Sequence, residues 1–100
     1  MSKSINGYII EEDLKTKTSS SVFWQAEKGR TKYFLKRFDN PKRPSDRVSE
    51  AVRKQKNEAC DTFARERRKV LYALKACVGS SIIAPVEFFE FENRFYQATE

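Results

Sequence analysis

Residues 31–38 have the sequence TKYFLKRF, in which basic residues alternate with aromatic and aliphatic ones. Because the side chains of a β-strand point alternately to the two faces of a sheet, this pattern predicts a strand. The preceding run at residues 22–26, VFWQA, is apolar and aromatic, and it favours a second strand. Between the two runs, Gly29 can adopt the positive φ of a tight turn at residues 27–30, which predicts a hairpin.

The residues upstream of this hairpin extend the predicted sheet. Residues 6–14, NGYIIEEDL, are expected to form a first strand or the lead-in to one, and residues 15–21 form a short polar run. Together with the hairpin, they predict three strands joined by short turns in an antiparallel meander.

Downstream of the hairpin, the sequence predicts a helix. The segment NPKRP at residues 40–44 is expected to break the strand, because a proline cannot continue a hydrogen-bonded ladder. Ser45 or Asp46 can then cap a helix. The stretch 61–76 is the expected helix, residues 46–60 form either a separate helix or an extension of it, and Gly79 ends it. The apolar residues at helical spacing are Val48, Val52, Ala59, Phe63, Val70, Leu71 and Leu74.

Two final strands complete the expected fold. They are predicted at residues 82–89 and 94–99, with a turn at Glu92 and Asn93 between them. The expected class is therefore α+β, with a five-stranded antiparallel sheet, one main helix and a basic helical insert before that helix. A chain of 100 residues and 11.7 kDa is long enough for one small domain, or for one lobe of a larger domain.

The composition excludes several kinds of chemistry. Histidine is absent, which rules out Ser-His-Asp catalysis, Cys-His catalysis and His-ligated metal sites within this chain. No run approaches the roughly 20 apolar residues of a membrane span, and no signal peptide opens the sequence, so we expect a soluble, cytoplasmic chain without a membrane partner. If Cys60 and Cys77 lie on one helix, they are roughly 25 Å apart, which predicts two reduced thiols rather than a disulfide.

The net charge of +6 is concentrated between residues 28 and 77. One interpretation is a nucleic-acid-binding domain, in which cations contact phosphates beside Phe34, Phe38 and Phe63. Because no nucleic-acid-binding motif accompanies the charge, we prefer a solvated helix face of mixed charge, and nucleic acid is not the expected partner. Another interpretation is a regulatory module whose basic region at residues 42–69 docks an acidic protein.

Three motifs, in this order of strands and helix, resemble the N-terminal lobe of bacterial-type serine/threonine protein kinases. YFLK at residues 33–36 is similar to the family's Val-Ala-Ile-Lys strand, and FARE at residues 63–66, followed by Val70 and Leu74, is similar to its helix αC. FYQATE at residues 95–100 is similar to the fifth strand and the start of the hinge. The resemblance covers residues 8–100, and it implies that the C-terminal lobe of a longer protein is the chain's partner.

The resemblance also implies an ATP site. Lys36 would contact the α- and β-phosphates of ATP, and Glu66 would hold Lys36 in place by an ion pair. Since Glu66 lies three residues after Phe63 and four before Val70, all three are expected on the helix face that packs on the sheet. The other positions implied for the ATP site are Lys15, Lys17, Ser20, Val22, Phe34, Thr99, which would be the gatekeeper, and Glu100, which would be the first hinge residue.

Further implications concern what this chain lacks. The family's catalytic loop and its magnesium ligands belong to the C-terminal lobe, so the chain alone is not expected to transfer phosphate to a protein substrate. An isolated lobe would expose apolar surface that its partner lobe covers, and we therefore expect the chain to associate with itself.

Two features depart from the family pattern. The window that matches the phosphate loop, residues 15–22, has Lys15, Lys17 and Ser20 where the family has glycine, and side chains there would crowd the phosphates. Phe34 occupies the place of a small alanine above the adenine ring, on the same strand face as Lys36. These departures leave open whether the parent protein is an active kinase or a pseudokinase that serves as a regulatory binding module.

Overall fold

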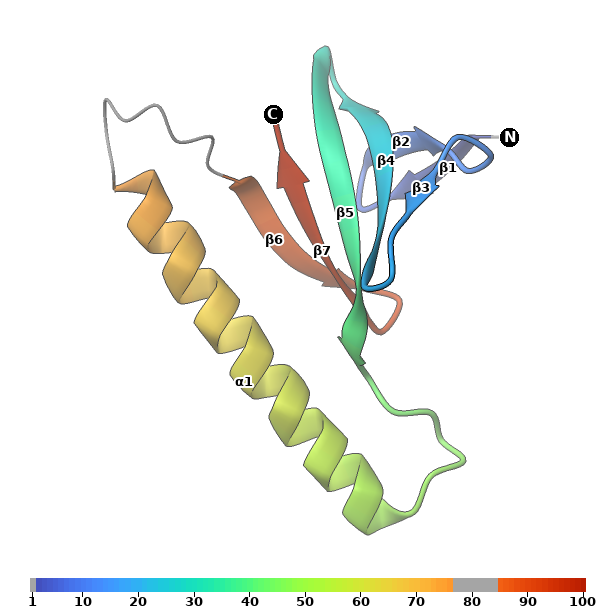
Figure 1. Ribbon diagram of the computed structural model, residues 1–100, viewed down its shortest axis with the longest axis vertical. Helices are drawn as coiled ribbons and strands as arrows, with labels where there is room; N and C mark the ends of the chain where they lie inside the picture. The colour runs from blue at the N-terminus through green and yellow to red at the C-terminus, as the bar shows by residue number, and fades with distance from the viewer. Residues whose placement is uncertain (1, 77–84) are drawn as a thin grey trace.

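The computed structural model describes residues 2–76 and 85–100, and it consists of one antiparallel sheet with one long helix beside it (Figure 1). In these residues the sheet has seven strands in the order β1-β2-β4-β5-β7-β6, with β3 paired to β4. The expected α+β class is confirmed, whereas the expected number of five strands is wrong. The elements in chain order are β1 (Ser2–Ile5), β2 (Tyr8–Glu11), β3 (Thr16–Lys17), β4 (Ser21–Lys28), β5 (Thr31–Lys42), α1 (Glu50–Lys75), β6 (Pro85–Phe91) and β7 (Arg94–Thr99).

The additional strands come from the N-terminal quarter of the chain. Asn6 and Gly7 have φ angles of 51° and 86° and form a tight turn between β1 and β2. Strand β2 lies within residues 6–14, where a strand or the lead-in to one was expected, whereas β1 was not predicted. An Asn-Gly pair favours this turn because both residues tolerate the left-handed backbone that it requires. The polar run that follows contributes the two-residue strand β3, which pairs with β4.

Both predicted turns form. Gly29 has a φ of 64° between β4 and β5, and Glu92 and Asn93 have φ angles of 49° and 67° between β6 and β7. Strand β5 ends at Lys42, inside the segment 40–44 that was expected to break it, although it continues through Pro41. The register between β5 and β7 shifts in this region, and the bulge keeps the proline, which has no N–H group, out of the ladder.

Helix α1 is a single helix of 26 residues. It begins after Ser49, whose hydroxyl accepts a hydrogen bond from the Val52 amide at 3.3 Å, so the expected caps Ser45 and Asp46 are wrong. The helix crosses the boundary between the predicted stretches 46–60 and 61–76 without interruption, so a separate basic helix before the main helix does not form. Among the described residues, no helix combines the length and the apolarity that crossing a membrane requires. The predictions for Cys77, Gly79 and the first residues of the 82–89 strand lie outside the described residues.

The main core lies on the face of the sheet that curls inward. Tyr8 from β2 stacks on Phe89 from β6 with ring centroids 5.8 Å apart, and its hydroxyl donates a 2.6 Å hydrogen bond to Glu87. These contacts join the first and last hairpins across the inner face. The buried residues of this core are Ile5, Tyr8, Ile10, Val22, Trp24, Ala26, Leu35, Phe89, Tyr96 and Ala98.

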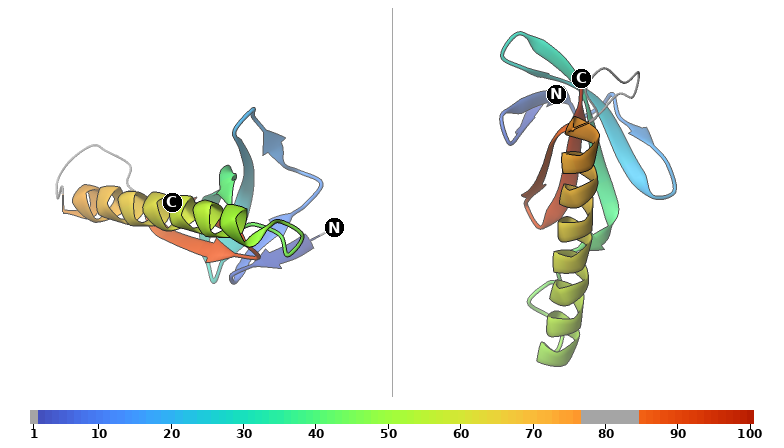
Figure 2. Two further views of the ribbon diagram at one scale, coloured as in Figure 1. Left: turned by 90° about the horizontal axis from the view of Figure 1, so that it is seen from below. Right: turned by 90° about the vertical axis from the view of Figure 1, so that its left-hand side faces the viewer.

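A smaller core lies between α1 and the outer face of the sheet. In the right-hand view of Figure 2, α1 lies in front of the strands and covers only this face. The predicted core positions Val52 and Val70 are instead 39% and 45% exposed, so the helix presents a different face to the sheet than expected. Cys60 is a free, buried thiol. The residues of this core are Phe38, Cys60, Ala64 and Phe95, with Phe63 and Phe88 packed against them.

Candidate functional site

Lys36 lies on the outer face of the sheet, the same face on which α1 packs. Its neighbours in the β5 sequence, Leu35 and Arg37, point to the inner face because side chains alternate along a strand. In the register of the sheet, Lys36 stands between Phe23 of β4 and Gln97 of β7. The three side chains therefore form one row across the outer face.

Aromatic rings surround the Lys36 ammonium. Its Nζ atom lies 4.5 Å from the ring centroid of Phe38 and 5.7 Å from that of Phe23. Burial of the ammonium lowers the pKa of Lys36 below its ordinary value, and the positive charge of Arg67 lowers it further. Cation–π contacts compensate part of the lost hydration, but they do not neutralise the charge.

Arg67 of α1 is the second cation at this place. Its Cζ atom lies 5.4 Å from the centroid of the same Phe38 ring, and its Nη2 donates a 2.7 Å hydrogen bond to Gln97 Oε1. The Nε atom of Arg67 is buried and has no hydrogen-bond partner in the described part of the chain. Helix α1 thus brings a guanidinium, and not a carboxylate, toward Lys36.

The expected ion pair between Lys36 and Glu66 does not form. Glu66 pairs with Lys69 at 3.7 Å, and its side chain is 61% exposed. None of the ion pairs among residues 2–76 and 85–100 joins Lys36 to a carboxylate. The reason is the rotation of the helix: Cys60, Ala64 and Arg67 face the sheet, and consecutive helical residues differ by about 100° around the axis.

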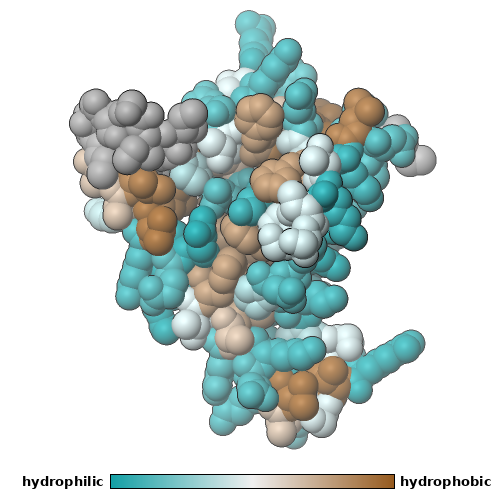
Figure 3. Space-filling view, viewed as in Figure 1, coloured by the Kyte–Doolittle hydropathy of each residue, from teal (hydrophilic) through white to brown (hydrophobic). Residues whose placement is uncertain are grey.

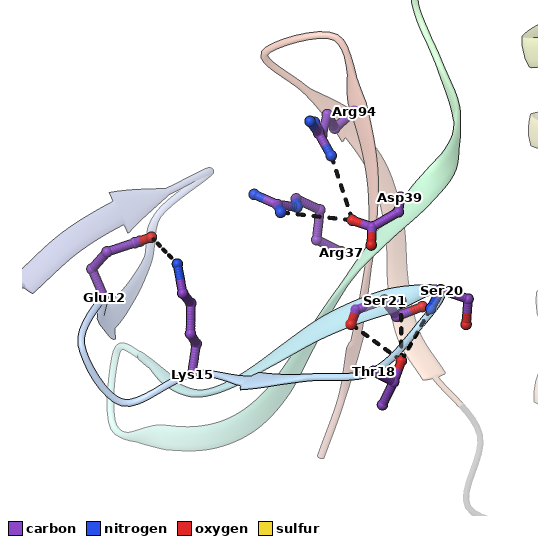
Figure 4. Close-up of polar contacts among 8 residues, drawn as sticks. All are labelled: Glu12, Lys15, Thr18, Ser20, Ser21, Arg37, Asp39 and Arg94. Atoms are coloured by element: carbon purple, nitrogen blue, oxygen red, sulfur yellow. Dashed lines mark hydrogen bonds and ion pairs between the residues drawn. The ribbon is translucent and has the colours of Figure 1, made fainter.

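The residues that match the phosphate loop form a turn that is already hydrogen-bonded within itself. The Thr18 hydroxyl oxygen accepts hydrogen bonds from the amides of Ser20 and Ser21 at 3.4 and 3.1 Å (Figure 4). Lys15 forms an ion pair with Glu12 at 3.6 Å on the exposed surface. These amides do not form an open cradle for phosphate, because the threonine oxygen occupies them.

The other predicted positions divide between the two faces. Val22 is 1% exposed in the inner core, on the face of the sheet opposite to Lys36, whereas Phe23 is the β4 residue that pairs with Lys36. Phe34 shares the outer face with Lys36, as predicted, and is 57% exposed. Thr99 is its partner in the register of β7. The remaining predicted positions, Lys17 of β3, Ser20 of the turn and Glu100 after β7, are exposed.

A second polar cluster lies on the inner side of β5, and Figure 4 shows it beside the Thr18 turn. The Asp39 carboxylate lies 3.6 Å from Arg37 and 3.5 Å from Arg94. Arg37 also lies 5.6 Å above the Trp24 ring. Since a carboxylate lies between the two arginines, this cluster is partly neutralised, in contrast to the pair of cations on the outer face.

Three residues of the outer face were not predicted for the site: Phe23, Gln97 and Arg67. The turn at Gly29 sets the hairpin register, so counting back from it would have placed Phe23 opposite Lys36. No comparable signal in the sequence identifies Arg67, since it is one of several basic residues in the same turn of helix. In Figure 3, apolar side chains gather between α1 and the strands within a mostly polar surface.

No family model, curated protein or solved structure matches this chain.

Proposed function

We propose that the chain is the nucleotide-facing lobe of a protein-kinase-like protein, in which Lys36 contacts the phosphates of ATP. The observation that carries the proposal is the state of the Lys36 ammonium, which is partly buried on the helix-covered face of the sheet and forms no ion pair with a carboxylate of the described residues. A partly dehydrated cation without a counter-ion is unfavourable, and an anionic ligand would stabilise it.

The surroundings of Lys36 support a nucleotide rather than a simple anion. Phe34 stands two residues before Lys36 on the same face, with 57% of its surface exposed. An exposed aromatic ring on the same face as a cation would offer a stacking surface for a base whose phosphates contact the cation.

The outward position of Glu66 favours the pseudokinase form of this proposal. Without the lysine–glutamate pair, Lys36 would bind phosphate but would not be held as an active kinase holds it. Magnesium would accompany ATP, and its ligands would come from the C-terminal lobe. In this form the chain binds a nucleotide and presents the lobe to a protein partner.

The proposal is tested by ATP binding to the chain and to two variants that lose the same charge. Isothermal titration with ATP, with and without magnesium, is expected to show that Lys36→Ala binds about tenfold or more weakly than the natural chain, because a charge-assisted hydrogen bond is lost. Lys56→Ala, an exposed lysine on α1, is the matched control and should bind normally. Equal affinities of the two variants, or no binding by the natural chain, would contradict the proposal.

A further inference from the structure

Two cations share one aromatic ring where α1 crosses the outer face of the sheet. Lys36 Nζ and Arg67 Cζ lie 4.5 and 5.4 Å from the centroid of the Phe38 ring. The two positive charges repel each other. Burial lowers the pKa of Lys36, and the charge of Arg67 lowers it further. Arrangements of this kind are unfavourable in a protein unless something compensates the charges.

The contacts of Arg67 compensate it only in part. The hydrogen bond to Gln97 is made to a neutral amide, so it orients the guanidinium without neutralising it. The carboxylates nearest in sequence are engaged elsewhere: Glu66 pairs with Lys69, and Asp61 pairs with Arg43. The buried Nε of Arg67 finds no acceptor among residues 2–76 and 85–100. A helix residue with a purely structural task at this position would be better served by an apolar side chain of similar length.

We infer that Arg67 and Lys36 together bind the phosphate groups of a polyphosphate ligand on the outer face of the sheet. The planar guanidinium would contact two oxygens of one phosphate, and the ammonium would contact an oxygen of the adjacent phosphate. Gln97 is the positioning residue, because it holds the guanidinium from β7, one strand away from Lys36. That the polyphosphate belongs to a nucleotide rests on the function proposed above, but the anion site itself does not.

This arrangement assigns α1 a direct part in binding. In the resembled family the helix contributes a carboxylate that positions the lysine, whereas here the helix residue facing the lysine carries the same charge as the lysine. The ligand, rather than Glu66, would then supply the negative charge between α1 and β5. Binding would therefore hold the helix against the sheet by joining Arg67 and Lys36 through the anion.

The experiment compares two ligands and four chains. The dissociation constants of tripolyphosphate and of ATP are measured by isothermal titration for the natural chain, Lys36→Ala, Arg67→Met and the control Arg65→Met. Arg65 is an exposed arginine of the same helix. Methionine keeps an apolar stem over Phe38 while removing the charge, and circular dichroism checks that each variant is folded.

We expect Lys36→Ala and Arg67→Met each to weaken tripolyphosphate binding about tenfold, and Arg65→Met to change it less than threefold. The slope of binding against salt concentration should fall in both site variants. If Arg67→Met binds both ligands as the control does while Lys36→Ala loses ATP, the two-cation site is wrong and the proposed function survives. If both variants lose tripolyphosphate but ATP binds no more tightly than tripolyphosphate, the anion site is supported and the nucleotide proposal is wrong. Failure of the natural chain to bind either ligand overturns both.

Discussion

Removing the charge of Arg67 should raise the pKa of Lys36. Lys36 Nζ and Arg67 Cζ lie 4.5 and 5.4 Å from the centroid of the Phe38 ring, so the two charges are no more than about 10 Å apart. At an effective dielectric constant of about 20, two unit charges about 10 Å apart repel each other by about 1.7 kcal/mol, and water and salt at this surface reduce that repulsion. We therefore expect Arg67→Gln to raise the pKa of Lys36.

Charge reversal extends the same calculation. Arg67→Glu replaces a repulsion by an attraction of similar size, so the pKa of Lys36 should rise by about twice as much as in Arg67→Gln. In Arg67→Gln the pKa should still lie below its ordinary value, since burial is the larger cause of the lowering and is retained.

The assay is an NMR titration of the Lys36 side chain at low salt, following the carbon and nitrogen atoms next to the ionising group. Arg65→Gln removes the same charge from the exposed side of α1 and should leave the pKa of Lys36 nearly unchanged. If Arg67→Gln leaves that pKa unchanged or lowers it, the two cations do not share the Phe38 ring in solution, and the reasoning about the outer face is refuted.

Two further predictions concern stability. Arg43 donates hydrogen bonds to both Glu90 carboxylate oxygens, at 3.0 and 3.1 Å, and to Asp61 at 3.0 Å. Arg43→Met should therefore lower the free energy of unfolding, measured in urea, by about 2 kcal/mol. A change below about 0.5 kcal/mol would contradict this role of Arg43. The pKa of Tyr8 is raised by burial and by its hydrogen bond to Glu87. The stability that Tyr8 contributes is therefore complete below the unfolded pKa of about 10. That stability is lost as the pH rises above this value, by up to about 1.4 kcal/mol per pH unit. Urea unfolding between about pH 8 and pH 11 should show a smaller alkaline loss in Tyr8→Phe, and an unchanged loss would show that Tyr8 does not cause it.

Local signals predicted most of the secondary structure correctly. Gly29 and the Glu92–Asn93 pair mark the turns of two hairpins, and both turns form where expected. The Asn6–Gly7 pair carries the same signal, and treating residues 6–14 as one strand overlooked it. Turns and strands could be predicted because their preferences depend on a few neighbouring residues.

The helix end was harder to predict than the helix itself. Ser45, Asp46 and Ser49 all have side chains that can cap a helix, and propensity does not choose among them. The structure starts α1 after Ser49, which accepts the hydrogen bond from Val52. The choice depends on how far β5 extends past Pro41, and that extension depends on pairing with β7.

Local patterns were enough to predict the hairpins at Gly29 and at Glu92–Asn93, a helix over residues 61–76, and a shared strand face for Phe34 and Lys36, because alternation and helical spacing are properties of the local chain. The position of Arg67 rather than Glu66 beside Lys36 depends instead on how the helix packs. The rotation of a helix about its axis depends on which side chains pack best against the sheet, and the small residues Cys60 and Ala64 fit against Phe38 and Phe95. Arg67 lies three residues after Ala64 and therefore shares its face of the helix. The long aliphatic stem of Arg67 covers the Phe38 ring, whereas Glu66 stays in water beside Lys69.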